Sequence, residues 1–264
     1  MARVRPGEAA NPAPPTVARV RVRFAKRGRL RFLSHRDVAR SLERAVRRAG
    51  LPVAHSHGFS PHPRLSWIGA APTGAASEAE YVEIGLTGPM DPGTLAEALD
   101  AALPDGLDVL AAVPAEGPPL VDRIDAGHWV VELPGVPPAA LRAALDALLA
   151  TDTVVVERVT PSGRRQVDVR AAVVRAEVVS GDTGAATISP DGNSEMGSTC
   201  AIMSAVVRQT IPAVRPGDVL GALDVVAGLS LPVPAKATRM AQGLLDRRGD
   251  LADPLGSEWV AARD

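Results

Sequence analysis

The chain has 264 residues, of which 46% are hydrophobic and 22% are charged, so it is long and apolar enough to bury one large or two small cores. Disorder throughout is therefore excluded. The single cysteine, Cys200, excludes an internal disulfide framework, a zinc site built from cysteines and an iron–sulfur cluster held by this chain alone. We expect a cytoplasmic protein, because the sequence shows no secretory signal and no stretch near the roughly 18 apolar residues of a membrane span.

The charge is distributed unevenly along the chain. Between Arg19 and Arg64 there are 13 basic residues and only two acidic ones, Asp37 and Glu43, whereas the chain from residue 65 onward holds 14 basic and 27 acidic residues. The formal net charge of −1 therefore hides a strongly cationic segment. This polarity indicates an anionic partner for that segment, because like charges would otherwise only repel one another.

Regular secondary structure is predicted to begin after an N-terminal arm. Residues 1–16 are rich in Pro and Ala and have no apolar periodicity, which is typical of a disordered arm. From Val17 to Phe24, apolar residues alternate with arginines, and this period of two predicts a strand with one solvated face. The arginines on that face are Arg19, Arg21 and Arg23.

A helix is predicted from about residue 35 to residue 49. Ser34 and Asp37 have the spacing of a capping box, and Gly50 supplies the left-handed residue that commonly ends a helix. At 100° per residue, one side of this helix is apolar and the other is almost purely cationic. The apolar side consists of Val38, Leu42, Ala45, Val46 and Ala49, and the cationic side of Arg36, Arg40, Arg44, Arg47 and Arg48.

The elements that follow complete one domain. A short strand is predicted at 51–54, then strands at 65–71 and 80–86, a helix from residue 92 and a strand at 107–113. Strand, helix, hairpin, helix and strand is the split order of a ferredoxin-like fold. Residues 17–114 are therefore predicted to form a basic ferredoxin-like domain.

A weaker copy of the same order follows. It predicts a second, acidic ferredoxin-like domain at 120–230, with a mobile Gly- and Ser-rich loop near 180–199. Residues 231–264 are assigned to a C-terminal tail with one short helix. The predicted fold class is thus α+β, with two tandem ferredoxin-like (βαββαβ) domains that have antiparallel sheets.

The loop before residue 65 is expected to bind a ligand. Pro61 and Pro63 fix their own φ angles and restrict the residues before them, so Ser60, His62 and Arg64 are displayed on a stiff loop. A connector rarely needs two prolines in three residues. Stiff polar loops beside a cationic surface typically carry a function.

These features together predict a surface that binds RNA phosphates. Strand surfaces of such folds commonly bind nucleic acid, and tandem ferredoxin-like domains resemble the layout of CRISPR repeat-processing endoribonucleases. We expect recognition of phosphate and shape, with little base stacking, because Phe24 and Phe32 are better used in the core. The residues predicted to bind RNA are Arg19, Arg21, Arg23, Arg29, Arg31, Arg36, Arg40, Arg44, Arg47, Ser60, His62 and Arg64.

Four of the five histidines lie within 28 residues of one another. His55, His57 and His62 have a spacing that suits a three-imidazole zinc site. However, the loop contains no carboxylate and its surroundings are strongly cationic, which disfavours a divalent cation. We therefore predict no metal site and no cofactor bound by this chain.

Two alternative functions remain open. His35 or His62 would serve as the general base of a metal-independent endoribonuclease, since a histidine near its ordinary pKa can activate an RNA 2′-hydroxyl while an arginine stabilises the phosphate. Alternatively, the cationic surface would dock an acidic protein partner. No confident catalytic residue follows from the sequence.

Most of the chain resembles the radical-SAM-linked protein family, a domain of unknown function, and the match is densest from about Val20 to Leu86. The FLSH-x-D element is matched by Phe32, Leu33, Ser34, His35 and Asp37, and the GF-x-PHPR loop is matched by Gly58, Phe59, Pro61, His62, Pro63 and Arg64. His55 and His57 depart from the residues that relatives usually carry, which further weakens the zinc interpretation.

The resemblance implies a role beside a radical SAM enzyme. Members of that family stand alone or form the C-terminal part of larger proteins with a radical SAM region. This chain lacks the cysteine triad that holds the radical SAM cluster, so the resemblance implies an accessory subunit. The resulting hypothesis is an accessory protein that presents tRNA or rRNA to a radical SAM modification enzyme.

Overall fold

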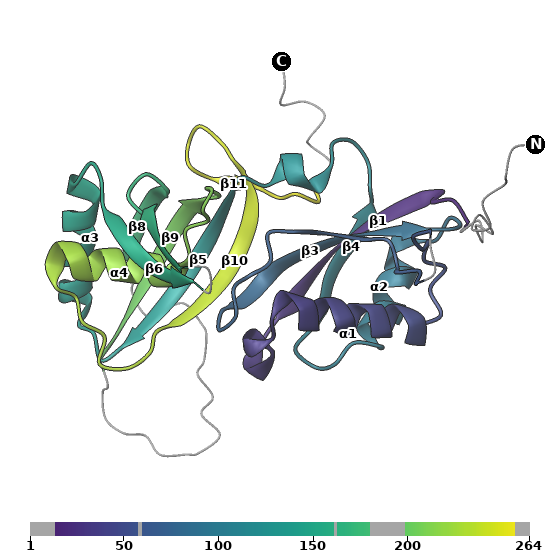
Figure 1. Cartoon of the computed structure of the whole chain (residues 1–264), viewed down its shortest axis with the longest axis horizontal. Coiled ribbons are helices and arrows are strands. Elements are labelled where there is room, and N and C mark those ends of the chain that lie inside the picture. The colour runs from purple at the N-terminus through teal and green to yellow at the C-terminus, as the bar shows by residue number, and fades with distance from the viewer. Residues whose placement is uncertain (1–13, 58–59, 161–162, 180–198, 257–264) are drawn as a thin grey trace, which may run out of the picture. The chain divides into compact units, whose positions relative to one another are not determined.

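The computed structural model describes residues 14–57, 60–160, 163–179 and 199–256 (Figure 1). The chain divides into two compact units, and each mixes strands with helices. The first unit comprises the residues up to 73, those from 78 to 121 and the C-terminal end from 255, and the second comprises 74–77 and 122–254. The sheet structure is mostly antiparallel and four α-helices accompany it, so the fold class is α+β.

The first unit contains a four-stranded sheet in the order β4-β1-β3-β2. Strand β1 is antiparallel to β4, and β2 is antiparallel to β3. In chain order the elements are β1 (Ala18–Lys26), the 3-10 helix η1 (Gly28–Phe32), α1 (His35–Arg48), β2 (Leu65–Ile68), β3 (Ala76–Leu86), α2 (Pro92–Asp100) and β4 (Val109–Pro114).

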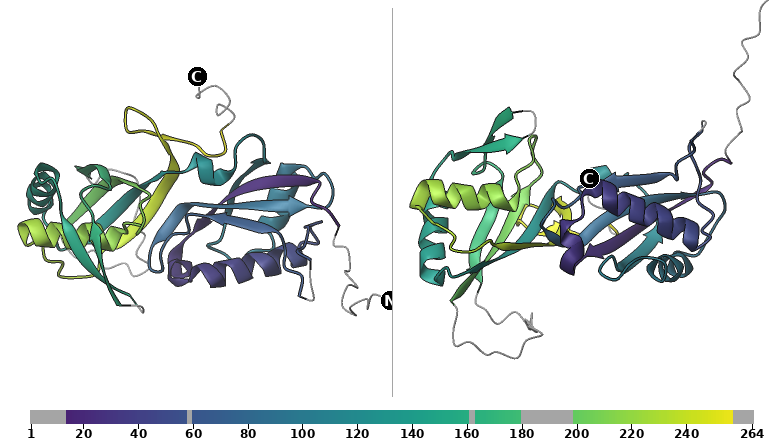
Figure 2. Two further views of the ribbon diagram at one scale, coloured as in Figure 1. Left: turned by 45° about the horizontal axis from the view of Figure 1, so that its top comes forward. Right: turned by 60° about the horizontal axis from the view of Figure 1, so that its bottom comes forward.

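Helices α1 and α2 pack against one face of this sheet, and α1 is the purple helix that runs along it in Figure 2. Their core is built from Val22 and Phe24 of β1, Leu42 of α1, Ile84 of β3 and Leu99 of α2, all of them at most 1% exposed. The predicted helix and its apolar side are therefore confirmed. The strand expected at 51–54 is reduced to one isolated bridge, from Val53 to Leu86, which is a correction.

The cap of α1 is the one that its sequence predicts. The Ser34 Oγ accepts a hydrogen bond from the Asp37 backbone N–H at 3.3 Å and donates its own proton to Asp37 Oδ2 at 2.6 Å. These hydrogen bonds from Ser34, with a smaller contribution from the Arg40 charge, hold the pKa of the Asp37 carboxyl below its ordinary value. The Asp37 charge is thus used to fix the start of the helix.

The second unit contains strands in the order β10-β5-β9-β8, antiparallel throughout. Strands β6 and β7 form a separate two-stranded hairpin. After the 3-10 helix η2 (Leu120–Arg123), the elements are β5 (Ala126–Pro134), α3 (Pro138–Ala150), β6 (Val155–Thr160), β7 (Gly163–Asp168), β8 (Val173–Val179), β9 (Cys200–Arg208), α4 (Pro216–Ala227), β10 (Lys236–Leu245) and β11 (Leu251–Ala252).

Strand β10 corrects the predicted C-terminal tail. It pairs with β5 along its length, and the second unit extends to Pro254. The sequence hides this strand because two of its buried side chains, Arg239 and Gln242, are polar, so no apolar alternation marks it. Upstream of it, residues 163–179 contain two strands, β7 and β8.

Two of the predicted segments lie mostly among residues that the structure does not describe. Most of the predicted N-terminal arm, residues 1–13, and nearly all of the loop predicted near 180–199 lie outside the described residues. In the part of the chain that the structure describes, no helix is both long enough and apolar enough to cross a membrane.

The burial of α1 yields a stability prediction. Leu42→Ala removes a fully buried side chain from the core, and we expect it to lower the free energy of unfolding by about 2–5 kcal/mol. Arg40→Ala, on the exposed side of the same helix, should change it by less than about 0.5 kcal/mol. Urea titration followed by circular dichroism measures both. Equal effects of the two variants would contradict the observed orientation of α1.

Candidate nucleic-acid interface

The exposed side of α1 is strongly cationic, and the half-buried Glu43 is the acidic residue on the same side of the helix. All five arginines predicted for it are exposed, and we call them the cationic face of α1. Among the described residues none of the five forms an ion pair. Arg44 and Arg48 donate hydrogen bonds, to Ser41 Oγ at 3.1 Å and to the Ala102 carbonyl at 3.2 Å. The face consists of Arg36, Arg40, Arg44, Arg47 and Arg48.

The predicted solvated row on β1 is wrong at Arg21, which is only 2% exposed. Its Nε donates to Glu83 Oε2 at 3.1 Å, and its terminal nitrogens donate to the carbonyls of Glu116 and Pro118 at 2.8 and 2.6 Å. The segment after β4 thus covers this side of the strand. Arg21 is therefore fixed inside the first unit.

The other two arginines of that row are also engaged. The Arg23 Nε donates to the Glu78 carbonyl at 2.7 Å, and this side chain is half-buried. Arg19 is exposed, with Nη1 3.5 Å from Glu83 Oε1. Glu83 was not expected beside this row, because it lies more than 60 residues further along the chain than Arg19 and Arg21.

Two further basic residues of the cationic segment also have partners inside the first unit. Arg27 forms ion pairs with Glu78 and Asp108, and the hydrogen bonds that it donates to the Glu78 carboxylate are the main cause that raises the pKa of its guanidinium. Lys26 is 1% exposed and donates to the Ala71 carbonyl at 3.2 Å. The positive charge counted in the sequence is therefore larger than the charge left on the surface.

The 3-10 helix η1 places its residues differently from expectation. Arg29 is exposed, while Arg31 is half-buried with its guanidinium carbon 4.7 Å from the centre of the Phe32 ring. Phe24 lies in the core as predicted, but Phe32 is 59% exposed, so its expected place in the core is wrong.

The proline-containing loop is held together at its two ends. The Ser56 N–H donates to the His62 carbonyl at 2.9 Å, and the His62 N–H donates to Ser56 Oγ at 3.0 Å. The Arg64 N–H donates to the Ala54 carbonyl at 2.7 Å. Ser60, His62 and Arg64 are all exposed, as predicted, while the first residues of the motif, 58 and 59, lie outside the described residues.

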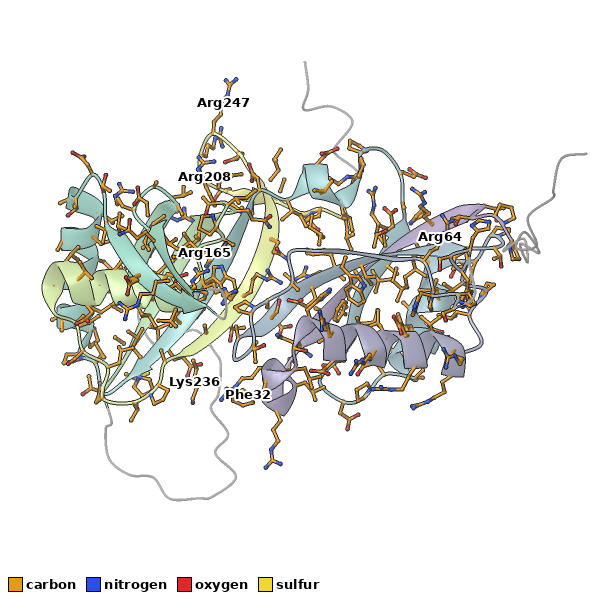
Figure 3. All side chains as sticks on the ribbon, viewed as in Figure 1. Phe32, Arg64, Arg165, Arg208, Lys236 and Arg247 are labelled. Atoms are coloured by element: carbon orange, nitrogen blue, oxygen red, sulfur yellow. The ribbon has the colours of Figure 1, made fainter. Side chains whose placement is uncertain are left out.

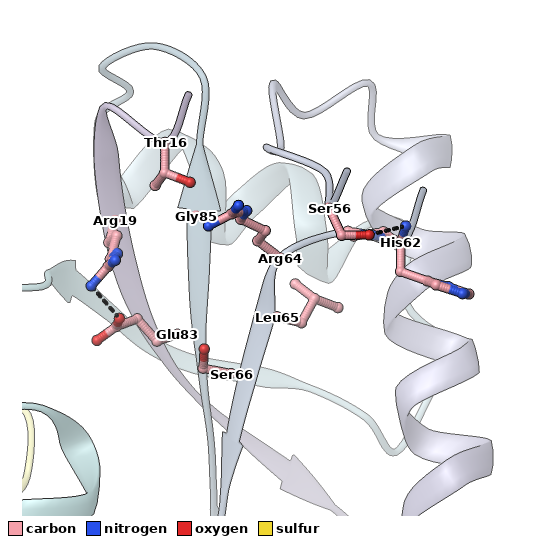
Figure 4. Close-up of a pocket in the computed structure, with 10 residues that line it drawn as sticks. Thr16, Arg19, Ser56, His62, Arg64, Leu65, Ser66, Glu83 and Gly85 are labelled. Atoms are coloured by element: carbon pink, nitrogen blue, oxygen red, sulfur yellow. Dashed lines mark hydrogen bonds and ion pairs between the residues drawn. The ribbon is translucent and has the colours of Figure 1, made fainter. Parts of the chain in front are cut away.

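A cavity of about 380 Å³ opens beside this loop (Figure 4). The Thr16 Oγ1 atom is buried at its edge and has no hydrogen-bond partner among the described residues. Gly85 makes room there, because a Cβ would lie 3.1 Å from Thr16 and 3.3 Å from Arg64. The lining residues are Thr16, Arg19, Ser56, His62, Pro63, Arg64, Leu65, Ser66, Glu83 and Gly85.

The cavity has a basic character. Its one lining carboxylate, Glu83, is already paired with Arg19 and with the buried Arg21, whereas the Arg64 guanidinium is exposed and makes only a 3.4 Å contact to the His55 carbonyl. The cavity therefore presents cationic groups and hydroxyls. Sequence reasoning found Arg19, His62 and Arg64 but assigned Thr16 to the disordered arm.

The histidines are not gathered into one site. The His35 ring meets the Trp67 ring edge-on, with 5.2 Å between centroids, so packing accounts for it. His62 lines the cavity, while His55 is half-buried and His57 exposed. Within the described ranges, no group of three or more His, Cys, Asp or Glu side chains is placed to hold a metal ion.

The comparison with protein families gives a clear match. The chain belongs to a family of uncharacterized proteins conserved in bacteria (DUF2344). The match covers residues 19–216, which include the cationic face of α1 and most of the cavity lining. No curated protein matches the chain. A solved structure of an unknown protein from Galdieria sulphuraria is 16% identical, with 84% of this chain and 98% of that chain covered and a TM-score of 0.21.

Two arginines of the β1 row, Arg19 and Arg21, should differ in their effect on stability. Arg21→Ala removes a buried guanidinium and its three hydrogen bonds, to Glu83 and to the carbonyls of Glu116 and Pro118, so we expect the free energy of unfolding to fall by about 3–5 kcal/mol. Arg19→Ala removes an exposed ion pair and should cost less than about 1 kcal/mol. Urea unfolding of the two variants tests this. A neutral Arg21→Ala would contradict the structural role assigned to Arg21.

Proposed function

We propose that this family member binds RNA and acts as an accessory protein. The observation that carries the proposal is the cationic face of α1, whose exposed arginines form no ion pair among the described residues. Like charges on one helix face repel one another and reduce stability, so this arrangement is best explained by an anionic ligand.

The spacing of the arginines suits a nucleic-acid backbone. Four of them, from Arg36 to Arg47, recur at intervals of three or four residues over 11 positions, which at 1.5 Å per residue spans roughly 16 Å. A guanidinium binds phosphate oxygens in a bidentate manner and remains charged at any physiological pH. Such a row contacts several phosphates in succession and reads no base sequence.

The fold supports RNA as the polymer. We propose that each unit is ferredoxin-like, because the first has the chain order βαββαβ with strand order β4-β1-β3-β2, and the second repeats that strand order as β10-β5-β9-β8 with one inserted hairpin. Small four-stranded α+β domains commonly bind RNA, which is an argument from analogy of fold.

The enzyme partner is proposed from the sequence motifs. The FLSH-x-D and GF-x-PHPR elements resemble the radical-SAM-linked family, and this suggests that the chain presents tRNA or rRNA to a radical SAM modification enzyme. The cavity supports a positioning role. Its volume lies in the range of roughly 300–1,000 Å³ that is usual for ligand sites, and Arg19, His62 and Arg64 line it, so we propose that it holds one nucleotide of the bound RNA.

Charge reversal on α1 tests RNA binding. We expect Arg40→Glu/Arg44→Glu to weaken binding of a fluorescent tRNA by about 100-fold or more, because two phosphate contacts become repulsive. For the wild type, the logarithm of the affinity should fall with the logarithm of salt concentration with a slope of about −3, as expected for four contacts. Fluorescence anisotropy measures both quantities.

A variant with the same change in net charge provides the control. Arg142 and Arg247 are exposed in the second unit, so Arg142→Glu/Arg247→Glu should leave RNA affinity within about twofold of the wild type once salt screens long-range effects. Equal loss in the two double variants would contradict a site on α1. Retention of an acidic protein after nuclease treatment, with no RNA affinity, would favour the protein-docking alternative.

The endoribonuclease alternative has weaker support. His62 is the one histidine that lines the cavity, and the lining carboxylate Glu83 is occupied by ion pairs, so no second acid–base group is placed beside it. We expect RNA incubated with the protein in EDTA to remain intact on a denaturing gel. Cleavage that is lost in His62→Ala while RNA binding is retained would establish the nuclease instead.

A further inference from the structure

An exposed aromatic ring lies at the end of α1 where the chain enters the helix. Phe32 is 59% exposed, and Figure 3 labels it beside the start of α1. Its neighbours Leu30 and Leu33 both pack against the core. A 3-10 helix has three residues per turn, so these two leucines share one face and Phe32 is turned away from it. The local backbone therefore presents this ring to solvent.

One side of the ring is backed by an arginine. The Arg31 guanidinium carbon lies 4.7 Å from the centre of the Phe32 ring, a cation–π contact. With that face covered and the ring still 59% exposed, the opposite face meets solvent. The Arg31 Nε atom is also buried without a hydrogen-bond partner among the described residues. The pair thus combines an open aromatic surface with a donor that is not satisfied.

The charges around the ring restrict what can cover it. Arg29 and Arg36 are exposed on either side of it in sequence, and the acidic neighbour, Asp37, is held in the cap of α1 by hydrogen bonds from Ser34. An apolar protein surface would have to desolvate these exposed cations, at a cost in free energy. A ligand that carries both an aromatic ring and negative charge can cover the Phe32 ring and pair with the exposed arginines beside it.

We infer that Phe32 stacks on an unpaired base of the RNA whose phosphates lie on the cationic face of α1. This inference rests on the proposed function and adds a substrate class to it. A base inside an A-form helix offers no free ring face, whereas bases in loops, bulges and single-stranded ends do. The preferred RNA therefore carries an unpaired nucleotide next to a phosphate backbone that α1 holds.

The test compares two RNAs of equal length, a hairpin with an unpaired loop and a fully paired duplex. Phe32→Ala should weaken binding of the hairpin by roughly 5- to 100-fold, the effect usual for loss of one stacking side chain, and leave duplex binding within about twofold. The ratio of wild-type to variant affinity should not change with salt, because stacking releases no counterions. Fluorescence anisotropy at two salt concentrations gives both values.

A conservative variant adds a direct readout. Phe32→Trp keeps a stacking ring, so it should retain hairpin affinity, and its extra tryptophan emission, obtained by subtracting the wild-type signal, should be quenched by the hairpin and not by the duplex. Since Phe32 is exposed, neither variant should disturb folding, which circular dichroism checks.

The outcomes separate this inference from the proposed function. If the wild type binds RNA through α1 and Phe32→Ala binds the hairpin normally, the stacking role is wrong and the proposed function stands. Equal loss for hairpin and duplex would likewise overturn selection of unpaired bases. If the wild type binds neither RNA, and Arg40→Glu/Arg44→Glu changes nothing, both the inference and the proposed function fail.

Discussion

Burial of the apolar side of α1 against the sheet of the first unit is the constraint on which the surface of this unit depends. Val38, Leu42 and Val46 lie in the core, and a helix with one buried side must expose the other. The backbone of α1 therefore holds its arginines at fixed positions, and Arg44 and Arg48 add hydrogen bonds to Ser41 and Ala102. This arrangement makes a rigid cationic row, which loses little conformational freedom in the backbone when a ligand binds.

The remaining basic residues of the same segment have a different role. Arg21, Arg23 and Lys26 are buried or half-buried and donate to carboxylates and carbonyls of the first unit, so they stabilise the fold. A charge of this kind is costly to bury unless it is hydrogen-bonded or paired, and each of the three donates to an acceptor of the first unit. The chain thus uses one cationic segment for two purposes: internal hydrogen bonds and an ion pair on β1, and a cationic surface without ion pairs among the described residues on α1.

The residues of the FLSH-x-D element also have two kinds of role, in the fold and on the surface. Leu33 packs against the core, Ser34 and Asp37 cap α1, and His35 packs on Trp67. These contacts explain why such residue types are needed, but they leave Phe32 without a packing role. The exposed ring adds an apolar contact that is insensitive to salt beside an electrostatic surface that is sensitive to it. Phosphate binding and base stacking are thereby expected from adjacent parts of one short segment.

The sequence by itself determined the α+β class and the α1 helix with its cap. It also determined which side of α1 is apolar and which is cationic, and that the loop residues His62 and Arg64 are exposed. These features depend on local periodicity and turn chemistry. Only the tertiary structure decided which arginines remain free, since Glu78, Glu83 and the segment after β4 reach β1 from distant parts of the chain. It also decided that Phe32 faces solvent and that 236–245 forms a strand, because both depend on which neighbours bury a side chain and not on local pattern.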